Sequence, residues 1–468
     1  MRKILPLIAI VSVMFSCQDP EDEEIIVQEP EYKILSYTDK KTISITYSYP
    51  SIDENGNEIT LSSALVAWKP TEKDSVNEIK SVIIGCHITI TDDAGCPSSY
   101  LKSFVTGDAM LLFALPTQAD ITELRRSIVI MPDYQGYGVS RDRIHPYLSQ
   151  ELTARQVTDA VKYGLQLYKD LDNGQPFADD WKSICIGYSQ GGAVALGTQK
   201  YIEQHEMDDD LHFAGSFCAA GPYDLFSTLR YYIEDDGQSF GVQTKHRRMT
   251  TPEPLVMPLL IKGMIDTDPG MKGHSVSNYL SKQFLDTGIM DWISEKEMST
   301  DQIRSALYDM CEKGHTAKDG TIYSPNQMQV LFPVHAKKQT VMGTDYEVTA
   351  DLTQMLTPEL LEYLDITSLT EPSAENYDII NDLMLAFSRN SLVNGWEVKH
   401  KIVFLHSKYD TTVPLSNYLE FIDHHPEAKT RFIPFGKDDH QTTGIKSYLS
   451  LVGTTFLEDF TWLFTEKE

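Results

Sequence analysis

The sequence lacks the short motifs by which metal-dependent and nucleotide-binding enzymes are usually found. It contains no His-Glu-x-x-His motif, no pair of Cys-x-x-Cys motifs, no Gly-x-x-x-x-Gly-Lys-Ser/Thr loop and no complete EF-hand loop. The stretch DTDPG at 266–270 has two carboxylates but lacks the remaining ligands of a calcium site, so a turn is expected there. We therefore expect chemistry that needs no metal and no organic cofactor.

Cysteine is scarce, with six in 468 residues. Five follow Cys17, and an odd number spread over so long a chain is not a disulfide framework. One bridge could form, but none is required. Some of these cysteines lie in apolar runs that predict buried strands, where cysteine usually acts as a small apolar side chain. The five are Cys86, Cys96, Cys185, Cys218 and Cys311, and those in apolar runs are Cys86, Cys185 and Cys218.

Basic residues are few: 40 Lys and Arg stand against 68 Asp and Glu, which gives a formal net charge of -28 at pH 7. An acidic surface repels phosphate backbones, so nucleic acid is not expected as a partner. Internal repeats are also missing, which argues against repeat architectures such as β-propellers. The length is compatible with one large α/β unit that carries insertions.

The N-terminus has the features of a secretory signal. In MRKILPLIAIVSVMFSC, two basic residues precede an apolar stretch that is too short to span a bilayer. Residues 1–16 resemble a bacterial lipoprotein signal peptide, which implies a lipid on Cys17 and membrane attachment through that lipid alone. The acidic residues that follow predict a disordered tether over 17–34. They also resemble an export signal, so we expect a cell-envelope lipoprotein on the outer membrane, facing the exterior.

The stretch ICIGYSQGGAVALG, residues 184–197, places a serine between a predicted buried strand and a predicted helix. A chain that turns from strand to helix within two or three residues is strained at the turning residue, and it needs small neighbours. Gly187 and Gly191 supply them, in the Gly-x-Ser-x-Gly pattern of a nucleophile elbow. Ser189 is therefore the predicted nucleophile. The alternative is that Ser189 is only a small residue in a tight turn, and the flanking strand and helix argue against it.

Alternating strand and helix patterns over 35–223 predict an α/β fold with a mostly parallel sheet flanked by helices. The pattern stops over 224–395, which is mainly helical and is interpreted as an inserted cap or lid over the strand ends. It resumes over 396–468, with two strands and a last helix within GIKSYLSLVGTTFLEDFTWLFTE. We therefore predict one core, 35–223 with 396–468, that carries a large helical cap.

A serine nucleophile needs a histidine base that is oriented by a carboxylate. Asp410 follows the predicted strand KIVFLHSKY, and His440 follows the predicted strand TRFIPFG, which gives the order Ser, Asp, His. His424 and His425 compete for the role of base, but FIDHHPEAK is typical of the end of a surface helix. Asp438 and Asp439 lie too close to His440 in the chain to face its ring easily. The predicted triad is Ser189, Asp410 and His440.

These motifs resemble those of the secretory lipase group of α/β-hydrolases, the lipases and esterases similar to fungal lipase A. The resemblance covers about residues 80–465 and rests on TDDAGCPSSY, PDYQGYG, GYSQGG and YDTTVP. It implies an α/β-hydrolase fold with a helical cap before the acid-bearing strand.

The resemblance further implies an oxyanion hole made by Asp133 and Gln190. Gln190 stands where the fungal enzymes tend to have glycine. A rival donor is the backbone near His87, at the end of the first core strand. His145, in RIHPYL, is interpreted as structural, with pocket lining as the alternative.

The function expected from these residues is serine carboxylic ester hydrolysis through an acyl-enzyme, on extracellular esters of lipids or of acylated polysaccharides. One alternative is a serine peptidase similar to prolyl oligopeptidase, although the β-propeller of such enzymes is missing. The other is a surface lipoprotein whose hydrolase fold only binds, since a fold does not by itself imply an activity.

Overall fold

The computed structural model describes residues 24–28, 33–38, 41–99, 107–233, 249–340, 343–366, 378–453 and 455–465. Its centre is a ten-stranded sheet in the order β1-β2-β3-β4-β6-β5-β7-β8-β15-β16. The pairs from β1 to β4 and the β4–β6 pair are antiparallel, and all pairs from β6 to β16 are parallel. The strands are β1 (Glu24–Gln28), β2 (Lys33–Thr38), β3 (Thr42–Ile52), β4 (Glu58–Trp68), β5 (Ile79–Cys86), β6 (Ser127–Pro132), β7 (Phe177–Tyr188), β8 (Phe213–Ala219), β15 (Lys401–Ser407) and β16 (Thr430–Phe435).

The inner parallel strands are largely buried on both faces, whereas the edge strand β16 is partly exposed. On β5, Val82 and Ile84 belong to one apolar core and Ile83 to the other, because successive side chains of a strand point to opposite faces. A strand covered on both sides is apolar throughout, which explains the continuous apolar runs in the sequence. The predicted mostly parallel α/β class is confirmed.

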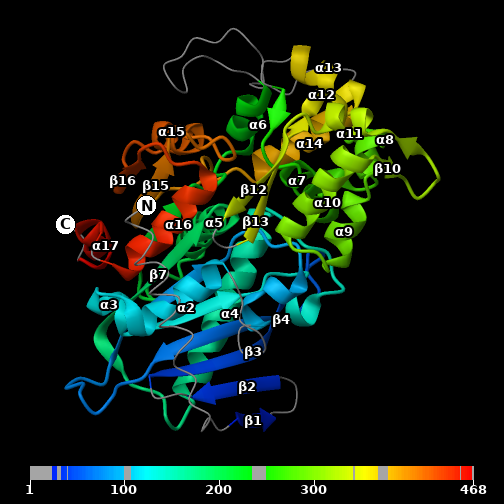
Figure 1. Ribbon diagram of the computed structural model, residues 1–468. Coiled ribbons are helices and arrows are strands. Elements are labelled where there is room, and N and C mark those ends of the chain that lie inside the picture. The colour runs from blue at the N-terminus through cyan, green and yellow to red at the C-terminus, as the bar shows by residue number, and fades with distance from the viewer. Residues whose placement is uncertain are drawn as a thin grey trace.

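Helices cover both faces of this sheet (Figure 1). Apolar residues of α4, α5 and α15 pack into one core, and those of α2, α3, α16 and α17 pack into the other. Their bounds are α2 (Asp108–Gln118), α3 (Thr122–Arg125), α4 (Gln150–Lys169), α5 (Gln190–Gln204), α15 (Ser416–His424), α16 (His440–Val452) and α17 (Leu457–Phe464). The last helix predicted from the sequence is thus two helices, α16 and α17.

The segment between β8 and β15 forms the predicted helical cap, drawn in green to orange in Figure 1. Its apolar side chains, among them Met264, Ile303 and Phe387, belong to the same core as Val82 of β5. The cap is therefore packed continuously against the sheet domain. Its elements are α6 (Leu225–Ile233), β9 (Thr250–Thr251), α7 (Val256–Thr267), α8 (Lys282–Leu285), α9 (Ile289–Glu295), α10 (Thr300–Lys313), β10 (His315–Thr316), β11 (Ile322–Tyr323), α11 (Pro325–Leu331), β12 (His335–Thr340), β13 (Gly343–Val348), β14 (Ala350–Asp351), α12 (Leu352–Met355), α13 (Pro358–Ile366) and α14 (Asp378–Arg389).

The N-terminal region differs in part from the predicted tether over 17–34. Residues 24–28 form β1, which pairs with β2 from Lys33 onward. The run Ile25, Ile26 and Val27 favours a strand despite the acidic residues before it, because branched apolar side chains suit a pleated sheet. The predicted signal peptide, residues 1–16, and Cys17 lie outside the described residues.

The five cysteines after Cys17 are all buried and free. Burial raises the pKa of the Cys86 thiol, as expected for a cysteine that serves as core packing. In the portion of the chain that the structure describes, no helix has both the length and the apolar character of a membrane span.

Candidate active site

Ser189 occupies the turn between β7 and α5, with φ 57° and ψ -125°. A serine rarely adopts this strained conformation, which is held here by a 2.9 Å hydrogen bond from its amide to the carbonyl oxygen of Ala219. A Cβ atom on Gly191 would lie 2.0 Å from the carbonyl oxygen of Cys86, and one on Gly187 would lie 2.0 Å from that of Gly191. Both glycines are required because backbone occupies the space of their missing side chains.

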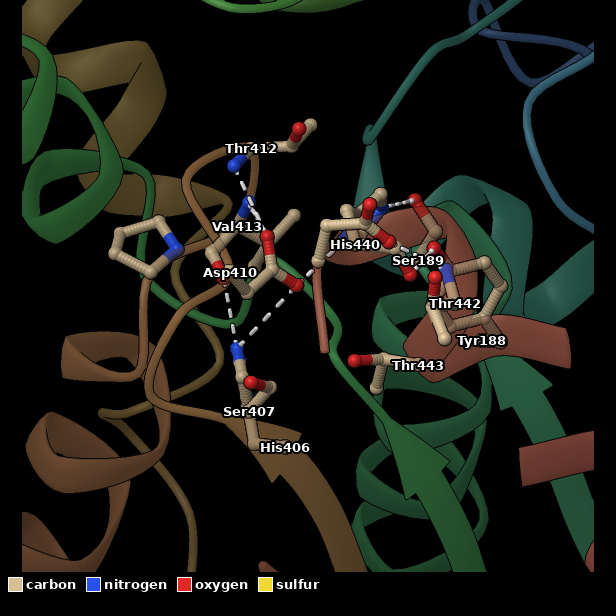
Figure 2. A network of polar contacts seen from close by, with 12 residues as sticks. Tyr188, Ser189, His406, Ser407, Asp410, Thr412, Val413, His440, Thr442 and Thr443 are labelled. Atoms are coloured by element: carbon tan, nitrogen blue, oxygen red, sulfur yellow. Dashed lines mark hydrogen bonds and ion pairs between the residues drawn. The ribbon is translucent and has the colours of Figure 1, made fainter. Parts of the chain in front are cut away.

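The structure brings the three predicted triad residues together (Figure 2). The Oγ atom of Ser189 lies 2.9 Å from Nε2 of His440, and Nδ1 of His440 lies 2.6 Å from Oδ2 of Asp410. A carboxylate opposite Nδ1 holds the proton on that nitrogen. The other nitrogen, Nε2, is then free to accept the proton of the serine hydroxyl group.

Asp410 is fully buried, in the loop after β15. Its second carboxylate oxygen, Oδ1, accepts hydrogen bonds from the amides of Thr412 (2.9 Å) and Val413 (2.8 Å). Both carboxylate oxygens thus have hydrogen-bond partners, which orients the group with Oδ2 toward His440.

His440 is the first residue of α16, and its backbone is fixed from both sides. The hydroxyl group of Tyr188, next to the nucleophile, donates a 2.6 Å hydrogen bond to the carbonyl oxygen of His440. The side chain of Asp439 caps α16 by accepting from the amide of Thr442 at 2.8 Å. Gly444 packs against the Tyr188 ring, and a Cβ atom there would lie 2.3 Å from Cε1 of that ring.

His406 is a site residue that the sequence analysis missed. Its Nε2 lies 2.7 Å from the carbonyl oxygen of Val413 and 3.9 Å from Oδ2 of Asp410 (Figure 2). Burial lowers the pKa of His406, so the neutral ring donates to the Val413 carbonyl group and holds the loop that carries Asp410. A histidine four residues before an acid carries no recognisable motif, so only the fold reveals this contact.

The competing residues lie outside the triad. His424 ends α15, where its Nδ1 bonds the carbonyl oxygen of Glu420, and His425 packs on Trp396. Asp438 pairs with Lys446 at 2.5 Å, and Asp439 serves as the helix cap. The sequence-based preference for Asp410 and His440 over these four residues agrees with the geometry.

Asp133 does not offer its amide to a substrate, so its predicted place in the oxyanion hole is wrong. Its N–H donates a 3.0 Å hydrogen bond to the carbonyl oxygen of Ser62, as part of the antiparallel β4–β6 pairing. Its buried carboxylate accepts from the Ser62 hydroxyl group (2.5 Å) and from the Ser98 amide (2.7 Å). Burial raises the pKa of Asp133 to about 6. The residue thus joins β4 to the segment that carries Ser98.

Gln190 begins α5, so its amide is one of those that a helix start leaves without an intrahelical acceptor. Its side chain is buried and points to His145, whose Nε2 lies 3.3 Å from Nε2 of Gln190. His145 was interpreted as structural, and its half-buried side chain contacts the residue after the predicted nucleophile.

The loop after β5 lies beside the elbow. A Cβ atom on Gly191 would come within 2.9 Å of the carbonyl oxygen of His87 as well. The amide of Ile88 donates to Asp108 at 2.8 Å, and the Thr89 hydroxyl group bonds that of Tyr147 at 3.0 Å. This loop is where the sequence placed the rival donor near His87.

No group of three or more His, Cys, Asp or Glu side chains is arranged to hold a metal ion within the described ranges. A serine, a histidine and a carboxylate hydrogen-bonded in this order have the geometry in which the histidine can take the serine proton and the carboxylate can orient the histidine.

Several solved structures resemble this one. The rice cell wall degrading esterase LipA from Xanthomonas oryzae superposes with a TM-score of 0.61 at 19% identity, over 93% of this chain and 96% of that one. A putative hydrolase from Legionella pneumophila gives 0.58 at 16% identity, over 94% and 91%. Candida antarctica lipase A gives 0.53 at 13% identity, over 91% and 79%. No protein-family model and no curated protein sequence matches the chain.

Proposed function

Because the chain has the α/β-hydrolase fold of these esterases and lipases, we propose that it is a serine carboxylic ester hydrolase. The observation that carries the proposal is the line of hydrogen bonds from Ser189 through His440 to Asp410, at the carboxyl end of the central strands. In open α/β sheets, reacting groups gather at that end. A fold alone does not assign an activity, so the proposal rests on these side chains.

In the proposed reaction, Oγ of Ser189 attacks the ester carbonyl carbon while Nε2 of His440 takes the hydroxyl proton. Asp410 stabilises the imidazolium through the proton on Nδ1. The tetrahedral intermediate collapses, the C–O bond to the alcohol breaks, and His440 returns its proton to the leaving alkoxide. Water, activated by the same histidine, then hydrolyses the acyl-enzyme and restores Ser189.

The negative oxygen of the tetrahedral intermediate needs N–H donors. We propose that the backbone amides of Gln190 and Thr89 form the oxyanion hole, instead of those of Gln190 and Asp133. Gln190 follows the nucleophile, and Thr89 belongs to the loop that packs against Gly191. Hydrolases of this fold draw their second donor from the loop after the corresponding strand. One such donor typically contributes about 3 kcal/mol to transition-state stabilisation.

The proposed substrates are extracellular esters, which accords with the predicted lipid on Cys17 and an outer-membrane position facing the exterior. Esters of acylated polysaccharides and of lipids both remain candidate substrates. The description of LipA as cell wall degrading favours polysaccharide esters.

The peptidase alternative loses support, because the described part of the insertion is mainly helical. An inert binding protein is disfavoured by the hydrogen-bonded triad.

A fluorophosphonate probe tests the proposal, since it phosphonylates an activated serine far faster than an ordinary one. The expected result is a mass increase on the peptide that contains Ser189, and no labelling of Ser189→Ala. A series of p-nitrophenyl esters from acetyl to palmitoyl then gives the acyl preference. Absence of labelling in the wild type, with no ester hydrolysed, would overturn the proposal.

A further inference from the structure

Two neighbouring residues, His145 and Tyr147, touch both sides of the proposed oxyanion hole. The Nε2 atom of His145 lies 3.3 Å from Nε2 of Gln190, the residue after the nucleophile. The hydroxyl group of Tyr147 lies 3.0 Å from Oγ1 of Thr89, in the loop after β5. Gln190 and Thr89 are far apart in the chain, so a single three-residue segment, His145 to Tyr147, joins two independent parts of the site.

The direction of the His145 hydrogen bonds follows from their partners. Nδ1 lies 3.0 Å from the carbonyl oxygen of Gln135, which can only accept, so Nδ1 carries the proton. Nε2 of His145 is then the acceptor for an N–H of the side-chain amide of Gln190. Burial lowers the pKa of His145 to about 3, which keeps the ring neutral and Nε2 available.

The partner of Nδ1 is itself fixed. The side chain of Gln135 donates to Oε2 of Glu54 at 2.8 Å and accepts from Nε2 of Gln156 at 2.8 Å. The His145 ring also packs edge-on against Tyr137 and Tyr147, with centroids 4.9 and 5.8 Å apart. The imidazole is therefore held in one position before any substrate binds.

The cap packs on the same segment. A Cβ atom on Gly263, within α7, would lie 2.4 Å from the carbonyl oxygen of Tyr147. The cap helix and the backbone of Tyr147 are thus in direct contact, which leaves the segment little freedom to move away from Thr89.

We propose that His145 and Tyr147 are positioning residues. They hold Gln190 and Thr89 so that the backbone amides of both residues point at the negative oxygen of the tetrahedral intermediate. This inference rests on the proposed ester hydrolase function. The Gln190 side chain is buried, and its Oε1 has no partner among the described residues, so His145 is the contact that orients it. A donor displaced by a fraction of an ångström loses much of its effect on the transition state.

Two substitutions of His145 separate its two hydrogen bonds. His145→Asn keeps a donor near the Gln135 carbonyl group but is too short to reach Gln190. His145→Gln places an acceptor near the former Nε2 position and gives up the bond to Gln135. We expect His145→Asn to lower kcat by about 10- to 100-fold with KM changed less than twofold, because the lost interaction acts on the transition state. His145→Gln recovers most of that loss.

Tyr147→Phe removes only the hydroxyl group and is expected to lower kcat about 5- to 10-fold, again with little effect on KM. Gln190→Ala keeps the backbone amide and removes the side chain that His145 orients. If His145 acts through Gln190, the Gln190→Ala and His145→Asn losses are not additive in the double variant. Thermal unfolding of each variant shows whether it is folded at the assay temperature.

An active wild type whose kcat survives His145→Asn, or additive losses in the double variant, would overturn the positioning role and leave the ester hydrolase proposal intact. A folded His145→Gln that stays as slow as His145→Asn would also overturn it. A wild type that hydrolyses no ester and is not labelled by the fluorophosphonate would overturn both proposals.

Discussion

The carboxylate of Asp410 lies 2.6 Å from Nδ1 of His440, although Asp410 lies in the loop after β15 and His440 begins α16, the helix after β16. Asp410→Asn keeps the shape but places an amide opposite the imidazole, which favours the wrong tautomer. We expect kcat for ester hydrolysis to fall by about 100- to 10,000-fold. The matched control is Asp438→Asn, close in sequence but paired with Lys446, for which the rate should stay near the wild-type value. Equal rates for Asp410→Asn and the wild type would contradict the role of Asp410.

Gly191→Ala tests the packing of the elbow. The added methyl group would lie 2.0 Å from the carbonyl oxygen of Cys86, a backbone atom, so either α5 or the end of β5 must shift to make room. We expect the free energy of unfolding to fall by at least about 3 kcal/mol, at the upper end of the cost of overpacking. Gly436→Ala is the control, because nothing lies within 4 Å of its new methyl group. Chemical denaturation of both variants measures the difference, and equal stability would refute the packing argument.

The lowered pKa of His145 predicts how the free energy of unfolding depends on pH. Its pKa is lowered by burial from 6.5 to about 3, with His87 and Lys296 acting in the same direction. Between these values the unfolded chain binds a proton that the folded chain does not, so the free energy of unfolding falls as pH decreases from 6.5 toward 3. His145→Gln cannot titrate. From pH 7.5 to 5.0 the wild type should lose about 2 kcal/mol more than this variant. Parallel pH profiles would contradict the assignment.

Lys296 anchors the cap. It is almost fully buried after α9, and its Nζ donates to the carbonyl oxygens of Arg141 (2.6 Å) and Arg143 (2.5 Å) in the sheet domain. Lys296→Met removes two charge-assisted hydrogen bonds, so the free energy of unfolding should fall by about 3 kcal/mol. Lys318→Met, which removes an exposed pair with Asp291, should change stability little. A melting temperature that responds equally to both changes would contradict the anchor.

The sequence was sufficient for the parts of the site that depend on local geometry. Ser189 is identified by the two glycines that a strand-to-helix turn requires, and that requirement is visible in five consecutive residues. Asp410 follows an apolar run that is buried throughout, and His440 follows the run that forms the partly buried edge strand β16, so their places after strand ends could be predicted. The order of Ser189, Asp410 and His440 along the chain then predicted that the three would meet, and the structure places them within hydrogen-bond distance of one another.

Contacts between strands that are distant in the chain could not be predicted from the sequence. Asp133 follows an apolar strand just as Asp410 does, but its amide bonds Ser62 because β4 lies antiparallel to β6. No local pattern shows which neighbour a strand will pair with. The contact of His145 with Gln190 was missed for the same reason, since it depends on a loop that folds back over the elbow.

The C-terminal helix was predicted as one element because apolar residues recur through 444–466. The structure ends α16 at Val452 and starts α17 at Leu457. Gly453 follows the first helix, and Phe456 before the second has φ 63°, a left-handed conformation that interrupts a helix. The break lets Tyr448 and Phe460 reach the same core from two directions.

The most direct test of the central claim is the rate of p-nitrophenyl ester hydrolysis by the full chain, by Ser189→Ala, and by Ser294→Ala, whose serine is exposed in the cap. We predict that Ser189→Ala is at least about 1000-fold slower than the wild type, while Ser294→Ala matches it. Hydrolysis that persists in Ser189→Ala at the wild-type rate would contradict the assignment of Ser189 as the nucleophile.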